Sequence, residues 1–99
     1  MSARTWTLYL LRCGDGSLYA GITNALEKRL ATHASGKGAR YTRSRLPVAL
    51  AWSCGRQTAR DARRLEWAVK QLSRDEKLAL VAGDRALWRR LRKETLGAP

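Results

Sequence analysis

The sequence has few of the residues from which most metal and redox centres are built. It contains one histidine and two cysteines in 99 residues. A single histidine excludes metal sites that need two, and two cysteines are too few for a disulfide framework or a four-thiolate zinc site. We therefore expect Cys13 and Cys54 to be free thiols, buried or partly buried, as in a cytoplasmic protein.

Long apolar segments and phosphate-binding loops are also lacking. No run approaches the roughly 18 apolar residues that span a bilayer. The N-terminal stretch MSARTWTLYLLRC has no long apolar region with a small-residue cleavage site, so secretion is not expected. No glycine-rich loop has Walker or Rossmann spacing, and no nucleophile elbow supports a serine hydrolase.

Acidic residues are scarce beside basic ones. Eight Asp and Glu face 20 Lys and Arg, which gives a net charge of +12 and a pI near 11.1. Binding a polyanionic backbone releases counterions, so this excess predicts nucleic acid as the partner. An anionic membrane is a weaker candidate because the basic residues do not gather on one strongly apolar helix. We expect no membrane association.

The order of patterned segments predicts a small α+β fold. Strands are expected at 5–12, 17–22 and 48–54. Helices are expected over about 25–35, 58–72, 73–81 and 84–94, with a basic loop at 36–47. This order, β-β-α-β-α-α-α, predicts a three-stranded antiparallel sheet flanked by helices. We expect one domain over 1–99, with its core in about 5–81 and a basic C-terminal helix at about 84–94.

Residue pairs at two of the helix starts resemble capping boxes. Asn24 is followed three residues later by Glu27, and Ser73 is followed by Glu76. Gly36 is a plausible end for the first helix. We therefore expect the first helix to begin at a cap on Asn24 and the third at a cap on Ser73.

The loop length of the first hairpin decides whether its tyrosines share a face. A two-residue loop at Asp15-Gly16 puts Tyr9 and Tyr19 on opposite faces of the sheet. A three-residue loop over 14–16 pairs Tyr9 with Gly21 and puts both tyrosines on one face, because strand side chains alternate. These residues alone leave both loops open, and each tyrosine could simply be a half-buried strand aromatic.

The first predicted helix carries charge beside its apolar stripe. At 100° per residue, Arg29 and His33 share a sector with Leu26 and Leu30. A buried lone charge costs several kcal/mol. Arg29 therefore either faces an anion or extends to solvent from the edge of the stripe.

Glu66 raises the same question on the next helix, 58–72. It lies beside the apolar stripe, where it could form a surface ion pair with Lys70 or Arg63, worth only tenths of a kcal/mol. Alternatively, its carboxylate faces a cleft and holds a hard divalent cation through oxygen.

The segment GKGARYTRSRLP, at 36–47, is basic and contains no acid. Cations without an acidic partner, interleaved with an aromatic, are typical of a phosphate- and base-contacting loop. The other interpretation is a solvated loop whose tyrosine folds onto the core. The nucleic-acid contacts expected here are Lys37, Arg40, Tyr41, Arg43 and Arg45.

Taken in order, these motifs resemble the GIY-YIG nuclease superfamily, and most closely its small stand-alone bacterial members. The first motif reads TLY, ending at Tyr9, and the second reads YAG, beginning ten residues later at Tyr19. Arg29 in LEKRL and His33 one turn later also fit. GKGARYT, RRLEW and QLSRDEKLALV extend the likeness from about Trp6 to Val81. The first glycine and isoleucine of GIY are replaced by threonine and leucine, which removes no catalytic side chain.

The resemblance implies a metal-dependent endonuclease that hydrolyses DNA phosphodiester bonds. It implies the three-residue hairpin loop, and an Arg29 that faces inward onto a phosphate cleft. Glu66 would hold one Mg²⁺ or Mn²⁺, and DNA is implied over RNA. The implied catalytic residues are Tyr9, Tyr19, Arg29, His33 and Glu66.

Two other functions fit the charge equally well. One is a non-catalytic nucleic-acid-binding module on a nuclease-like fold, and the other is an RNA- or ribosome-associated structural protein. The sequence contains no recognition helix or zinc finger that would read bases, so we expect no strong sequence specificity from this chain alone. A compact site suits flexible, single-stranded or structured DNA, or needs a partner protein for targeting. The residues do not decide the oligomeric state.

Overall fold

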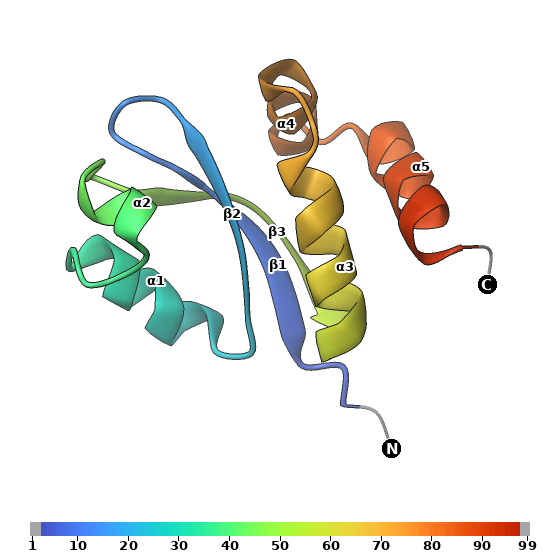
Figure 1. The fold of residues 1–99 in the computed structure, drawn as a ribbon, viewed down its shortest axis with the longest axis horizontal. Coiled ribbons are helices and arrows are strands. Elements are labelled where there is room, and N and C mark those ends of the chain that lie inside the picture. The colour runs from blue at the N-terminus through green and yellow to red at the C-terminus, as the bar shows by residue number, and fades with distance from the viewer. Residues whose placement is uncertain (1–2, 98–99) are drawn as a thin grey trace.

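Three antiparallel strands form the centre of the molecule, with helices on both sides (Figure 1). The computed structural model describes residues 3–97. The strands are β1 (Trp6–Arg12), β2 (Leu18–Thr23) and β3 (Ala49–Gln57), in the sheet order β2-β1-β3. The helices are α1 (Leu26–Ala34), α2 (Arg40–Arg43), α3 (Ala59–Lys70), α4 (Arg74–Val81) and α5 (Arg85–Leu96). The predicted α+β fold is confirmed.

The first hairpin has the three-residue loop. Tyr9 lies opposite Gly21, and Leu11 lies opposite Tyr19. Gly16 has a φ of +84°, a left-handed conformation that glycine adopts without strain. Both tyrosines therefore lie on the same face of the sheet, as the resemblance implied.

The alternation of β1 divides the molecule into two sides. Leu8 and Leu10 are fully buried against Leu65 and Val69 of α3. This cluster continues into α4 and α5 through Leu80, Leu87 and Leu91. Tyr9 points to the opposite face, where α1 and α2 lie (Figure 1). The strand therefore contributes alternate side chains to the core and to a second, more polar layer.

The segment predicted as a loop, 36–47, contains one turn of helix, α2. Four residues are too few to show a helical period, so the sequence pattern could not reveal this turn. Its local support is a side chain, because the Thr42 hydroxyl donates a hydrogen bond to the Ala39 carbonyl at 3.0 Å. α2 places the basic segment against α1 instead of leaving it free.

The helix caps agree with the sequence at one predicted box and differ at the other. Ser73 and Glu76 form the complete capping box of α4. The predicted cap on Asn24 was wrong. β2 continues to Thr23, and the N-cap of α1 is Ala25, which makes no side-chain capping hydrogen bond. The Thr23 hydroxyl accepts a hydrogen bond from the Ala25 amide at 3.0 Å instead.

Gly36 ends α1 as expected, with a φ of +82°. Its amide donates to the His33 carbonyl, and the next amide, that of Lys37, donates to the Thr32 carbonyl. These two bonds are those of a Schellman motif. The chain therefore reverses sharply after α1 and returns toward it as α2.

Cys13 is buried and Cys54 is partly buried, and both are free thiols, as predicted. Across residues 3–97, no helix is both long and apolar enough to cross a bilayer.

Candidate active site

A buried chain of hydrogen bonds links β1, α1 and α2. The Tyr9 hydroxyl lies 3.1 Å from His33 Nε2, and His33 Nδ1 lies 2.9 Å from Thr42 Oγ1. The three side chains are 2%, 1% and 0% exposed. Because Thr42 donates its one hydroxyl hydrogen to Ala39, it must accept a hydrogen from Nδ1. The neutral imidazole therefore carries its proton on Nδ1, and Nε2 accepts from the Tyr9 hydroxyl.

Two glycines make room for these rings. A Cβ on Gly21 would lie 2.6 Å from Cζ of Tyr9, the residue opposite it on β1. A Cβ on Gly38 would lie 2.8 Å from Cγ of His33. Any larger residue at either position would displace a ring of the chain. The sequence predicted the pairing of Gly21 with Tyr9 for one loop length, but not that either glycine makes room for a ring.

Tyr19 joins the buried chain to the surface. Its ring centroid lies 5.7 Å from that of His33, and 5.7 Å from that of Tyr41, on which it stacks at an interplanar angle of 23°. Tyr41 is 37% exposed, whereas Tyr19 is half-buried. A layer of aromatic rings thus runs from the interior to the solvent, with the Tyr19 hydroxyl on the half-buried ring.

Arg29 is exposed at the surface of α1. The helical sector that it shares with His33 is buried only at its C-terminal end, because His33 lies under α2 while Arg29 lies one turn earlier. Arg29 borders a small surface hollow of about 330 Å³ together with Thr23 and Thr32. Its charge still acts on the site, because it lowers the pKa of both Tyr9 and His33.

Burial and neighbouring charges keep Tyr9 and His33 uncharged at neutral pH. Burial raises the pKa of Tyr9 to about 12, with additions from Tyr19 and Glu66 and an opposing effect from Arg29. Burial, and then the charge of Arg29, lowers the pKa of His33. Both shifts agree with the hydrogen-bond chain, in which a neutral phenol donates to a neutral imidazole. Tyr9 is therefore a donor at neutral pH and not a base.

Glu66 is half-buried on α3, and its Oε2 lies 3.5 Å from Lys70 Nζ. The surface pair considered from the sequence is thus present. Its charge also contributes to the raised pKa of Tyr9, which places the carboxylate within electrostatic reach of the site. Glu66 and Arg29 therefore act on Tyr9 through charge, while Tyr19 and His33 contact it or its partner directly.

The carboxylate of Glu66 is the candidate metal ligand. Within residues 3–97, no three His, Cys, Asp or Glu side chains gather into a metal-binding group. One carboxylate is nevertheless a suitable donor set for Mg²⁺, which retains several waters and takes its other ligands from substrate phosphate. The residues present fit a divalent ion bound jointly by protein, water and substrate.

The basic segment supplies cations of two kinds. Lys37, Arg40 and Arg43 are exposed. Arg45 is instead held in place: its Nε lies 3.0 Å from Asp15 Oδ2, and its guanidinium lies 3.8 Å from the Tyr41 ring centroid. Arg45 thus fixes Tyr41 and ties the segment to the hairpin loop.

Comparison with known proteins extends the sequence resemblance. A family model for the GIY-YIG catalytic domain matches residues 5–79. A UPF0213 protein of Bacillus licheniformis is 52% identical over 77 residues, which cover 78% of this chain and 79% of that protein. A UPF0213 protein of Nitratidesulfovibrio vulgaris is 47% identical over 77 residues, covering 78% of this chain and 70% of that protein.

Two solution NMR structures have the same fold. A UPF0213 protein of Bacillus halodurans matches with a TM-score of 0.51 and 44% identity, covering 78% of this chain and 82% of its own. A protein from E. faecalis matches with a TM-score of 0.56 and 35% identity, covering 87% and 93%. Most of the length of each bacterial relative is matched, as expected for small stand-alone proteins. The chain belongs to the GIY-YIG family of catalytic domains.

Proposed function

We propose that the protein is a divalent-metal-dependent endonuclease that hydrolyses phosphodiester bonds in DNA. The observation that supports this most is the buried chain from Tyr9 through His33 to Thr42, which lies under Tyr19. An arginine and a carboxylate, Arg29 and Glu66, act electrostatically on this chain. Membership of the GIY-YIG family supports a nuclease, and the net charge of +12 supports a polyanionic substrate.

Each residue in this proposal has a separate task. Tyr9 keeps its proton and, through its hydrogen bond to His33, holds the buried side of the site in place. Tyr19 orients the attacking water or accepts its proton, since its half-buried ring lies between His33 and the surface. Arg29 supplies fixed positive charge to the phosphate as negative charge develops. Glu66 holds Mg²⁺ or Mn²⁺, and such an ion, when bound, would neutralise the phosphate and the leaving oxygen.

The basic segment is proposed to hold the substrate backbone. Lys37, Arg40 and Arg43 are exposed and can contact phosphates, while Tyr41 closes the site from above. The proposed substrate is single-stranded or structured DNA. A partner protein could direct the enzyme to it. The free thiols of Cys13 and Cys54 are typical of a reducing compartment, so we place this activity in the cytoplasm.

Cleavage of end-labelled substrates tests this proposal. Single-stranded, duplex and branched DNA, and single-stranded RNA, would be incubated with the protein in Mg²⁺, in Mn²⁺ and in EDTA. We expect cutting only with metal, and a loss of about 100-fold or more in Glu66→Gln and Arg29→Ala. Glu27→Gln, an exposed carboxylate of α1, is the matched control and should cut normally. Wild-type rates in Glu66→Gln would refute the assignment.

A second candidate is a nucleic-acid-binding module that does not cut. The observation that favours it is the contact between Lys70 Nζ and Glu66 Oε2, because an ammonium group at this position neutralises the carboxylate. Under this alternative, the protein would bind DNA in EDTA and leave it intact in both metals. Lys70→Met should then also leave the DNA intact. In a nuclease, the same substitution would free Glu66 to bind the ion.

A further inference from the structure

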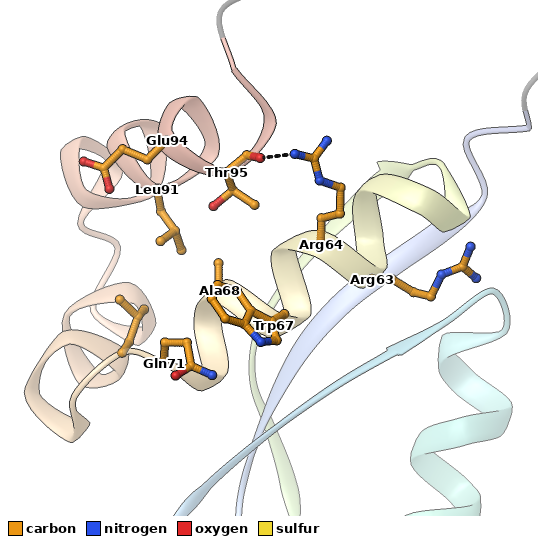
Figure 2. Close-up of a pocket in the computed structure, with 9 residues that line it drawn as sticks. Arg63, Arg64, Trp67, Ala68, Gln71, Leu91, Glu94 and Thr95 are labelled. Carbon is orange, nitrogen blue, oxygen red and sulfur yellow. Dashed lines mark hydrogen bonds between the residues drawn. The ribbon is translucent and has the colours of Figure 1, made fainter.

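A groove separates α3 from α5 on the side of the molecule away from α1 (Figures 1 and 2). Its volume is about 660 Å³, and its wall on α3 carries Trp67, which is 67% exposed. Ala68 and Leu91 line the bottom, where the two helices pack. The groove thus presents a largely exposed indole beside a small apolar contact.

The helical period explains why Trp67 is exposed. Leu65 and Val69 face the sheet and are fully buried. Trp67 lies about 200° around the helix from each of them, on the outer side of α3. An indole that is two-thirds exposed buries little apolar area, so its contribution to folding is small. A large aromatic in such a position is available to bind a ligand.

The charges at the groove favour an anionic ligand. Arg63 and Arg64 lie four and three residues before Trp67, on neighbouring turns of α3. Arg64 Nη2 donates to the Thr95 carbonyl at 2.7 Å, and Figure 2 shows it reaching toward α5. Arg63 points away from α5, and within residues 3–97 it makes no ion pair or side-chain hydrogen bond (Figure 2). The one acid of the groove, Glu94, lies 3.8 Å from Arg90, which offsets its charge.

The groove also lies next to the proposed catalytic carboxylate. Trp67 follows Glu66 directly, and Arg63 is one turn before both of them. A polynucleotide held at Glu66 can therefore pass Arg63 with its backbone and bring a neighbouring base over Trp67. Stacking of unpaired bases on aromatic side chains beside cations is how single strands are held without sequence reading.

We propose that Trp67 is a stacking platform for an unpaired nucleobase that flanks the cleaved phosphodiester, with Arg63 contacting the backbone. This inference rests on the proposed nucleic-acid substrate. It adds that the substrate is single-stranded next to the cleaved bond. Duplex DNA, whose bases stack on each other, cannot occupy Trp67 in this way.

Binding to the full chain in EDTA tests this without any cleavage. The probe is a fluorescent single-stranded oligonucleotide, used as DNA and as RNA of the same sequence. We expect Trp67→Ala to weaken binding by about fivefold or more, and Trp67→Phe to keep most of it. Leu50→Ala, which removes another exposed apolar side chain, is the matched control and should bind normally. A backbone of abasic sites should bind wild type and Trp67→Ala equally.

Each remaining outcome is decisive. Equal binding of normal oligonucleotides by wild type and Trp67→Ala would overturn the stacking platform and leave the proposed endonuclease standing. If Trp67→Ala changed only the sedimentation of the protein, the groove would be a site of protein–protein contact. That result would also overturn the stacking platform. An absence of nucleic-acid binding in every variant, wild type included, would instead refute the proposed function itself.

Discussion

At the scale of single residues, the site depends on a tyrosine that keeps its proton. Tyr9 is buried, donates to His33 and stays neutral because ionisation would place a negative charge in a poorly solvated position. The exposed Arg29 only partly offsets this effect. The tyrosine of the first motif therefore acts as a fixed hydrogen-bond donor, and in the proposed mechanism it is Tyr19 that orients the attacking water or accepts its proton.

The raised pKa of Tyr9, about 12 against an ordinary value of 10.0, predicts a loss of stability in alkali. Between these values, the unfolded chain has released the proton that the folded chain retains. The free energy of unfolding should therefore fall as pH rises, by at most about 1.4 kcal/mol per pH unit. Urea unfolding between about pH 10 and 12 measures this slope.

Tyr9→Phe is the control for that slope. Without the ionisable hydroxyl, this variant should start less stable and lose less stability over the same pH range. An ultraviolet titration of wild type should show a tyrosine that ionises well above the ordinary pKa of 10.0, and Tyr9→Phe should lack it. Identical alkaline slopes in the two proteins would contradict the assignment.

At the scale of elements, α2 matters because it closes over α1. Thr42, at 0% exposure, is its inward contact, and its hydroxyl is the acceptor for His33 Nδ1. Gly38 allows the approach, since any side chain there would meet the imidazole. The basic segment therefore does two things: it carries exposed cations and it fixes the tautomer of a buried histidine.

Thr42→Val should destabilise the protein by about 1–3 kcal/mol, because it keeps the shape and leaves a buried N–H without an acceptor. Thr42→Ser retains the hydroxyl and should lose less. Denaturant unfolding compares the two, and cleavage rates of the same variants show whether the tautomer matters for activity. If the valine and serine variants were equally stable, the hydrogen bond between the Thr42 hydroxyl and His33 Nδ1 would contribute nothing to stability.

Elements with a clear period could be predicted from the sequence, and contacts between elements could not. The strands, α3 and the Ser73 cap follow from local patterns. The four-residue α2 has no period, and the role of Thr42 exists only because the chain folds back onto His33. The exposure of Arg29 depends on where α2 covers α1, which helical spacing does not encode.

At the scale of the whole molecule, charge is spread over both sides of the sheet. Exposed cations lie on α2, on the outer side of α3 around Arg63, and on α5. This distribution is too extended for a small anionic ligand and fits a long polyanion better. The net charge of +12 should make association with nucleic acid strongly dependent on salt.

The salt dependence can be assigned to residues. Each lost phosphate contact should reduce the slope of log affinity against log salt by about 0.7 to 0.9. Arg43→Ala, at an exposed cation, should cause such a reduction. Arg45→Ala should change the slope less and the stability more, because Asp15 already holds this guanidinium. Equal slopes in wild type and Arg43→Ala would exclude a phosphate contact at that residue.

The side chains of β1 alternate between the core and the candidate site, and this limits which changes in the length of the strand the protein can accept. Leu8 and Leu10 belong to the core, and Tyr9 between them belongs to the site. A one-residue deletion or insertion within this seven-residue strand would exchange the two sets, since the side-chain period is two. Length variation is therefore not tolerable in β1. Engineering for thermal tolerance should therefore leave the length of the central strand unchanged.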